Sequence, residues 1–179
     1  MLTGNAAWMA MEIVTMPAIV ASACAQAPIT ELPRASKLIL GLFLLHYVHR
    51  ALIQPLRNPP RSPLHASVVL SAIAFNSING YLHGTWIARG VEAQRYGAVT
   101  LAAFVLGLSL FVIGATGNIW HDEVLRRLRL GAPPRTYAIP HGGLYRWISY
   151  PNYLCECASV LTRDRMDRMG YCSTRSCAP

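Results

Sequence analysis

The sequence predicts an all-α integral membrane protein, a multi-helix transmembrane bundle. Of its 179 residues, 53% are hydrophobic and only 13% are charged, and the mean hydropathy is +0.32. A soluble globular domain carries about 25% charged residues. Apolar runs near the ~20 residues that a helix needs to cross a bilayer recur along the chain. Together these observations favour a chain that crosses a membrane several times.

Four complete spans are expected, at residues 6–25, 36–56, 64–87 and 97–120. The stretches APITELP and RNPPRSP end the first and second spans, because proline cannot continue a helix. After the fourth span come a basic helical segment, a loop rich in proline and glycine, and the segment LYRWISYPNYLCECASVL. That segment is too short and too polar to cross alone, so we count it as a partial fifth element.

The N-terminal apolar stretch resembles a signal peptide in length and in its small residues near position 25. A signal peptide begins with a basic region, however, and this stretch has none. It also carries Glu12 within its apolar run. We therefore interpret it as a membrane helix that retains its acid.

The net charge of +8 comes almost entirely from arginine, which supplies 15 of the 16 basic residues. These arginines flank the apolar segments and form no single stripe, so they indicate membrane topology and not nucleic-acid binding. The loop after the second span and the segment after the fourth are the more positive side, which we place in the cytosol together with the N-terminus. The basic residues of that side are Arg57, Arg61, Arg126, Arg127, Arg129 and Arg135.

The five cysteines predict no metal site, because none of them has the paired Cys-x-x-Cys spacing of structural zinc sites. Cys24 lies in the first span and the other four lie late in the chain. We expect free thiols.

Ionisable residues within the spans are the first candidates for function, since burying one in hydrocarbon costs a few kcal/mol. Glu12 lies in the first span, with Trp8 one helical turn earlier on the same face. We expect its carboxyl group to be neutral there and able to donate a hydrogen bond to a carbonyl oxygen. A nearby tyrosine would help such an acid to stabilise an enolate.

The second and third spans add polar patches at helical spacing. In the second span, His46, Tyr47, His49 and Arg50 lie on one flank of an apolar helix. The third span carries Asn76, Asn79 and His83 at spacings of three and four. Each histidine taken alone could equally be a packing residue.

The stretch GNIWHDEVLRRLR, residues 117–129, places Asn118, Asp122, Arg126 and Arg129 along one helix face. Taken alone, the arginines are more typical of anchors for lipid headgroups. Asp122 and Arg126 could also form a plain surface pair. This face shares a predicted membrane depth with Glu12 and Tyr47, which favours a binding site and leaves Arg127 as the lipid-facing anchor. No G-x-G-x-x-G follows a strand pattern, so arginine and asparagine side chains would have to hold any nucleotide.

The stretches WMAMEI, FLLHYVHRALIQPLR, GNIWHDEVLRRLR and YAIPHGGLYRWISYPNYLCE, in this order, resemble the steroid 5α-reductase family. The resemblance covers about residues 7–156. It implies a fold of seven membrane helices in the endoplasmic reticulum. It also implies reduction of the C4–C5 double bond of 3-oxo-Δ4-steroids with NADPH as cofactor.

The resemblance assigns a role to each matching residue. Glu12 and Tyr47 would bind the steroid 3-keto oxygen and stabilise the enolate-like charge, with Trp8 in the same substrate site. Hydride from NADPH would reach C5, and a proton, from water, would reach C4. The cofactor residues would be Asn118, Asp122, Arg126, Arg129, Tyr137, Asn152 and Glu156, with His46 and Arg50 in the same polar site.

The chain departs from the family pattern at three places. Ala138 replaces the arginine that usually follows the tyrosine of the Y-R-I-P motif, which would remove one phosphate contact. After Glu156 the resemblance stops, and the chain continues as a polar, basic tail. We therefore expect a membrane domain over 1–156 and a disordered tail over 157–179. The chain also begins at the family's second helix, so we interpret it as truncated at both ends, with a tail typical of a frameshift, a retained intron or an alternative splice end.

Three alternatives stay open at this point. One is a reductase of another conjugated lipid, such as an enoyl-CoA or a polyprenal. A second is an inactive membrane fragment that associates only with lipid or other membrane proteins. A methyltransferase of similar build is the third, but the chain shows no motif for S-adenosylmethionine. The expected partners are a steroid or related lipid and membrane lipid, and we expect a monomeric, multi-pass protein.

Overall fold

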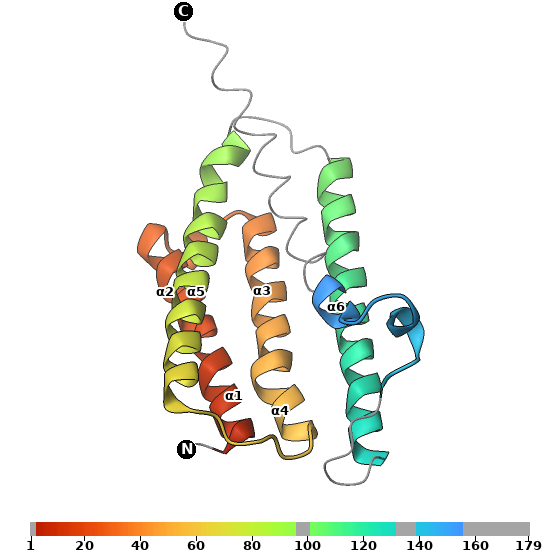
Figure 1. The fold of residues 1–179 in the computed structure, drawn as a ribbon. Helices are drawn as coiled ribbons and strands as arrows, with labels where there is room; N and C mark the ends of the chain where they lie inside the picture. The colour runs from red at the N-terminus through yellow and green to blue at the C-terminus, as the bar shows by residue number, and fades with distance from the viewer. Residues whose placement is uncertain (1–2, 96–100, 132–138, 156–179) are drawn as a thin grey trace, which may run out of the picture. The chain divides into compact units, whose positions relative to one another are not determined.

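A computed structural model describes the backbone of residues 3–95, 101–131 and 139–155, and side chains outside 90–104 in these ranges. Its regular structure there is entirely helical (Figure 1). The chain divides into two compact units, residues 1–95 and 96–179. Tyr137, Ala138, Glu156 and the tail 157–179 lie outside the described residues.

The first unit holds most of the helices. Its elements are, in chain order, α1 (Gly4–Ile13), α2 (Thr15–Gln26), the 3-10 helix η1 (Ile29–Glu31), α3 (Arg34–Val48), the π-helical turn η2 (His49–Ile53), α4 (Gln54–Arg57) and α5 (Ala66–Arg95). The first predicted span is thus two helices that meet at Val14, with Pro17 in the first turn of α2, where its missing N–H costs no helical bond. The second span is one helical run that ends before Pro59.

Helix α5 packs along both α1 and α2, and α3 lies beside them (Figure 1). The contact with α2 is close because Gly80 and Gly84 face it. A Cβ atom at Gly84 would overlap the Ile19 carbonyl group and the Ser22 hydroxyl group. Ser22 in turn donates a hydrogen bond to the carbonyl oxygen of Gly80, at 3.4 Å. Two glycines four residues apart let two helices approach in this way.

The apolar core of the first unit lies where α2, α3 and α5 meet. Its buried members are Ile19, Ala23, Leu32, Leu40, Phe43, Tyr47, Ile87 and Ala88. A smaller cluster joins α1 to the start of α5 through Ala7, Met11 and Val69. The predicted site residues Glu12, Tyr47 and Arg50 therefore stand on helices held together by apolar packing.

Within the described parts of the chain, two helical runs are long and apolar enough to cross a membrane, Gly4–Gln26 and Arg34–Arg57. They coincide with the first and second predicted spans. Helix α5 and the long helix α6 (Leu101–Gly131) run through most of the third and fourth. The prediction of an all-α protein is confirmed for these parts, while the number of membrane crossings stays a prediction.

In the second unit, residues 139–155 fold back onto α6. This segment contains the 3-10 helix η3 (Gly143–Arg146) and a helical turn at 151–155. Gly143 has a φ of 59°, and a Cβ atom there would overlap the ring of Trp120. Glycine is therefore required for the chain to turn this close to α6.

Candidate functional site

A buried ion pair joins α1 to the π-helical turn η2. The Nε atom of Arg50 lies 3.1 Å from Oε2 of Glu12, and the two side chains are only 19% and 9% exposed. π-helical turns are frequent at functional sites, because the extra residue changes where the following side chains point. The contact between Arg50 and Glu12 joins a guanidinium group to a carboxyl group at hydrogen-bonding distance. The hydrogen-bond-donating role expected for Glu12 from the sequence stays a prediction.

The indole ring of Trp8 completes this group. The guanidinium of Arg50 lies 5.6 Å from the ring centroid, and that of Arg61 lies 4.3 Å from it. Such cation–π contacts are worth about 0.5–2 kcal/mol each. The indole Nε1 is buried and has no hydrogen-bond partner among the described residues. Trp8, Glu12 and Arg50 are therefore brought together, whereas the sequence analysis placed Arg50 with the cofactor residues.

The side chain of Asn5 explains how Arg61 reaches Trp8. Its Nδ2 donates hydrogen bonds to the carbonyl oxygens of Pro55 (3.1 Å) and Asn58 (3.3 Å). Its Oδ1 accepts one from the Arg61 backbone N–H, at 3.2 Å. Asn5 thus holds the proline-rich loop against α1. The sequence analysis missed both Asn5 and Arg61 as neighbours of this site, since nothing local pairs them.

Tyr47 lies on α3, inside the apolar core. Its ring is 6.0 Å from that of Phe43 and 5.6 Å from that of His46, centroid to centroid. The Nδ2 atom of Asn79 on α5 donates to the Tyr47 hydroxyl oxygen at 3.4 Å. That contact uses a lone pair of the hydroxyl group and not its proton. His83, one turn after Asn79, packs on Phe43, with ring centroids 5.1 Å apart.

A second polar group lies in the other unit and contains three of the predicted cofactor residues. Asn118, buried on α6, donates through Nδ2 to the backbone oxygen of Asn152 at 3.0 Å. Asn152 donates through its own Nδ2 to Oδ1 of Asp122 at 3.3 Å. The Oδ1 atom of Asn152 is buried and has no hydrogen-bond partner in the part of the chain that the structure describes. This group therefore contains a buried acceptor that no described residue satisfies.

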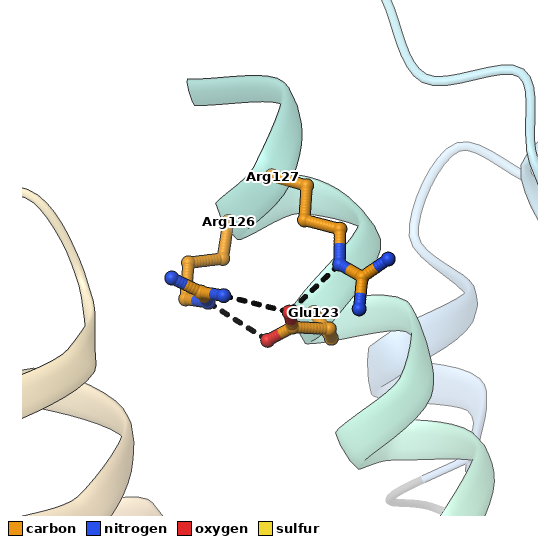
Figure 2. A network of polar contacts seen from close by, with 3 residues as sticks. All are labelled: Glu123, Arg126 and Arg127. Carbon is orange, nitrogen blue, oxygen red and sulfur yellow. Dashed lines mark hydrogen bonds and ion pairs between the residues drawn. The ribbon is translucent and has the colours of Figure 1, made fainter. Parts of the chain in front are cut away.

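Two arginines of α6, Arg126 and Arg127, contact Glu123 (Figure 2). Arg126 donates from Nε and Nη2 to the two carboxylate oxygens, at 2.7 Å each, and Arg127 donates from Nε at 2.9 Å. The carboxylate raises the pKa of Arg126 through these hydrogen bonds. Among the described residues Arg126 thus takes Glu123, and not Asp122, as its acidic partner. Spacings of three and four in the sequence would have revealed Glu123.

Two arginines of this helix, Arg127 and Arg129, are exposed. The side chain of Arg127 is 77% exposed although it bonds to Glu123, and Arg129 is exposed on the last turn of α6. A positive charge there is favourable next to the free carbonyl groups of a helix C-terminus. The lipid-anchor role of Arg127 stays a prediction.

Two groups of residues 139–155 have shifted pKa values. Burial, and then the negative charge of Asp122, raises the pKa of Tyr145 to about 12, although Arg129 opposes this. Burial also raises the pKa of the Cys155 thiol. Both side chains are therefore expected to be neutral at physiological pH, as is usual for groups packed between a segment and a helix.

The described residues contain no group of three or more His, Cys, Asp or Glu side chains that could hold a metal ion. The predicted cofactor residues Tyr137 and Glu156 cannot be placed, since they lie outside these ranges. His46 and Arg50, also predicted near a cofactor, lie in the first unit, where Arg50 pairs with Glu12.

Comparison with known proteins supports one family. A family model described as 3-oxo-5-alpha-steroid 4-dehydrogenase matches residues 62–163. The human protein named 3-oxo-5-alpha-steroid 4-dehydrogenase 2 is 36% identical over 155 residues, which are 87% of this chain and 59% of the human protein. The mouse protein named 3-oxo-5-alpha-steroid 4-dehydrogenase 1 is 34% identical over 154 residues, 84% of this chain and 58% of the mouse protein.

A third similar protein, uncharacterized, comes from Schizosaccharomyces pombe. It is 34% identical over 135 residues, which are 67% of this chain and 47% of the yeast protein. The chain therefore spans about half to three fifths of the length of these relatives.

Proposed function

The chain belongs to the 3-oxo-5-alpha-steroid 4-dehydrogenase family, and we propose that it reduces the C4–C5 double bond of a 3-oxo-Δ4-steroid with NADPH. The observation that carries this proposal is the buried Glu12–Arg50 pair beside Trp8, in a bundle that also holds Tyr47. Burying two charges costs several kcal/mol each before their attraction is counted. Charged groups at such a depth are typical of a site that must act on a polar group of a lipid.

In this proposal Tyr47 donates the hydrogen bond that polarises the steroid C3 carbonyl. The contact from Asn79 to the hydroxyl oxygen orients the phenol and strengthens it as a donor. Negative charge grows on the carbonyl oxygen as C5 is reduced, and donors that are already oriented stabilise it. We assign Glu12 the second polar contact to this oxygen, with Arg50 beside it and Trp8 as the apolar wall.

The second polar group fits a dinucleotide. Asn118, Asp122 and Asn152 would contact the dinucleotide, and Arg126 and Arg129 at the end of α6 would face its phosphates. Bound NADPH would supply the hydride that adds to C5, while water would supply the proton at C4. We propose a multi-pass location in the endoplasmic reticulum membrane, which fits the two apolar helical runs of the first unit.

The test is steroid-dependent NADPH oxidation by the full chain in microsomal membranes. A 3-oxo-Δ4-steroid should be consumed and its 5α-reduced product should appear, whereas a steroid without the C4–C5 double bond should give no turnover. Tyr47→Phe removes the proposed donor and should lower kcat by about 100-fold. Tyr81→Phe, an exposed position on α5, is the matched control. Glu12→Gln should also reduce turnover, and Glu31→Gln, exposed in η1, should not.

The same assay separates the alternatives. Turnover of an enoyl-CoA or a polyprenal but not of the steroid would favour a reductase of another conjugated lipid. If the folded wild-type chain turns over none of these substrates, the reductase proposal is wrong for this polypeptide. The alternative of an inactive membrane fragment, which associates only with lipid or other membrane proteins, would then be favoured.

A further inference from the structure

A histidine that the proposed reaction does not use lies at the centre of the second unit. His121 projects from α6 and is only 3% exposed. The rings of Trp120 and Tyr145 pack on it edge-on, with centroids 4.8 and 5.5 Å away. The Sγ atom of Cys155 lies 3.9 Å from its Nδ1. Residues from α6, from η3 and from the turn at 151–155 thus meet at one side chain.

The two ring nitrogens of His121 have opposite tasks. Nδ1 lies 2.6 Å from the carbonyl oxygen of Gly117, which can only accept, so Nδ1 carries the proton. Nε2 lies 3.4 Å from the backbone N–H of Leu144, which can only donate, so Nε2 is the acceptor. The geometry therefore assigns a single neutral tautomer. In addition, the Tyr145 hydroxyl group donates to the backbone oxygen of His121 at 3.5 Å.

The contacts of His121 lie near the start of the segment 139–155, at Leu144 and Tyr145, whereas Asn152 lies near its end. Leu144 and Tyr145 are bonded to His121, and a few residues later Pro151 is fully buried and Asn152 contacts Asn118 and Asp122. Asn152 can reach α6 only while the segment remains docked. The hydrogen bonds of Asn152 join the turn at 151–155 to α6, so they do not account for the position of η3.

We propose that His121 is a positioning residue: it holds residues 142–155 on α6 and so presents Asn152 to Asn118 and Asp122. The effect of His121 on cofactor binding rests on the proposed function, whereas its effect on the docking of residues 142–155 does not. The burial of its ring and the use of both ring nitrogens within the chain separate it from groups that would touch the substrate or the cofactor.

The docking is tested by the rate at which Cys155 is alkylated in the full chain in membranes. Peptide fragmentation by mass spectrometry assigns the label to Cys155, and its rate in each variant is compared with the wild-type rate. His121→Phe keeps an aromatic ring but removes both hydrogen bonds. It should raise the rate at Cys155 on the order of tenfold, the effect expected when a buried hydrogen-bonding group loses its partner. His141→Ala, at an exposed position of the same segment, should leave the rate unchanged.

His121→Gln is the conservative variant, since the side-chain carbonyl oxygen of glutamine can again accept a hydrogen bond from the Leu144 N–H. It should restore slow alkylation of Cys155 and slow hydrogen exchange of the Leu144 amide. If His121→Phe alkylates at the wild-type rate, ring packing alone docks the segment and the proposal is wrong. If His121→Gln is as labile as His121→Phe, the assigned hydrogen bond to Leu144 is wrong.

A binding measurement addresses the cofactor consequence separately. The Kd for NADPH, followed by its fluorescence, should rise on the order of tenfold in His121→Phe and return toward the wild-type value in His121→Gln. The KM for the steroid should stay unchanged. An unaltered Kd in a variant whose Cys155 is labile would overturn the link to Asn152. Absence of NADPH binding in the wild type would contradict the proposed function and leave the docking result standing.

Discussion

Two glutamate–arginine contacts in this protein use the same chemical groups in different surroundings. Glu12 and Arg50 come from separate helices and are buried, at 3.1 Å. Glu123 and its two arginines lie within three or four residues on α6, with shorter contacts of 2.7 and 2.9 Å (Figure 2). The shorter contacts belong to the more exposed network.

The difference shows that the distance between two charged groups does not by itself rank ion pairs by their contribution to stability. In the network on α6, Arg127 is 77% exposed and Glu123 is more exposed than Glu12, so losing one side chain should cost less there than in the pair of Glu12 and Arg50. In the buried pair the surviving charge has no comparable replacement, so losing one partner leaves a desolvated ion. The buried pair should therefore dominate the stability of its region, while the exposed network should mainly orient Arg126.

The largest expected effect is at the buried pair. Arg50→Met leaves the Glu12 carboxylate without its partner and should destabilise the fold by about 3–5 kcal/mol. Thermal unfolding in detergent measures this as a fall in Tm. The double variant Glu12→Gln/Arg50→Met should recover much of the loss, because no buried charge remains. A double variant as unstable as Arg50→Met alone would mean that side-chain packing, and not charge, explains the effect.

The packing that surrounds this pair should respond next. Gly84→Leu forces a side chain against the backbone of α2 and should cost about 1–3 kcal/mol, or separate the two helices. Gly41→Ala is the matched control, since a Cβ atom at Gly41 meets nothing within 4 Å. That change should stabilise α3 by about 0.5–1 kcal/mol. Equal Tm values for both variants would contradict the close approach of α5 to α2.

In the second unit, the phenol of Tyr145 offers a test by pH. Its folded-state pKa of about 12 lies above the ordinary value of about 10, so the neutral form favours the folded state. This contribution is complete below about pH 10 and is lost as the pH rises through about 12. An ultraviolet titration of the wild type minus Tyr145→Phe should therefore show a midpoint near 12. A midpoint near 10 would show that the segment 139–155 leaves this phenol in water.

The smallest effect is expected at the exposed network. Glu123→Gln should change Tm less than Arg50→Met and Gly84→Leu do, and high salt should reduce this difference, because salt screens the more exposed charges. The same substitution replaces the carboxylate that accepts two hydrogen bonds from Arg126. If Arg126 holds a phosphate of NADPH, the Kd for NADPH should change in this variant while Tm hardly moves. A large loss of Tm that persists in high salt would contradict the comparison between the two networks.

Much of the helical course could be predicted, because apolar runs and their terminating prolines are local signals. The run Arg34–Arg57 covers the predicted span 36–56, and α5 begins near the predicted start of the third. The two-helix character of the first span was not expected, although Pro17 is a local signal for it. Glycines at positions 80 and 84 were likewise readable as a helix-packing motif.

For the candidate site, helical spacing predicted only which residues share a helix face, Trp8 with Glu12 and Asn118 with Asp122. It suggested Asp122 for Arg126, whereas the structure selects Glu123, because the rotamers of a long arginine reach either residue and spacing does not choose between them. His121 was passed over, since its partner Leu144 lies on a segment whose return path no local pattern specifies.

The sequence alone determined the helical class, the apolar spans and the family, since these depend on composition and on the order of motifs along the chain. Only the tertiary structure decided which polar atoms face one another: Glu12 with Arg50, Asn79 with Tyr47, and His121 with Leu144. The reason is physical. A helix forms from contacts within a few residues, whereas the partner of a buried charge or ring nitrogen is set by how separate segments pack in space.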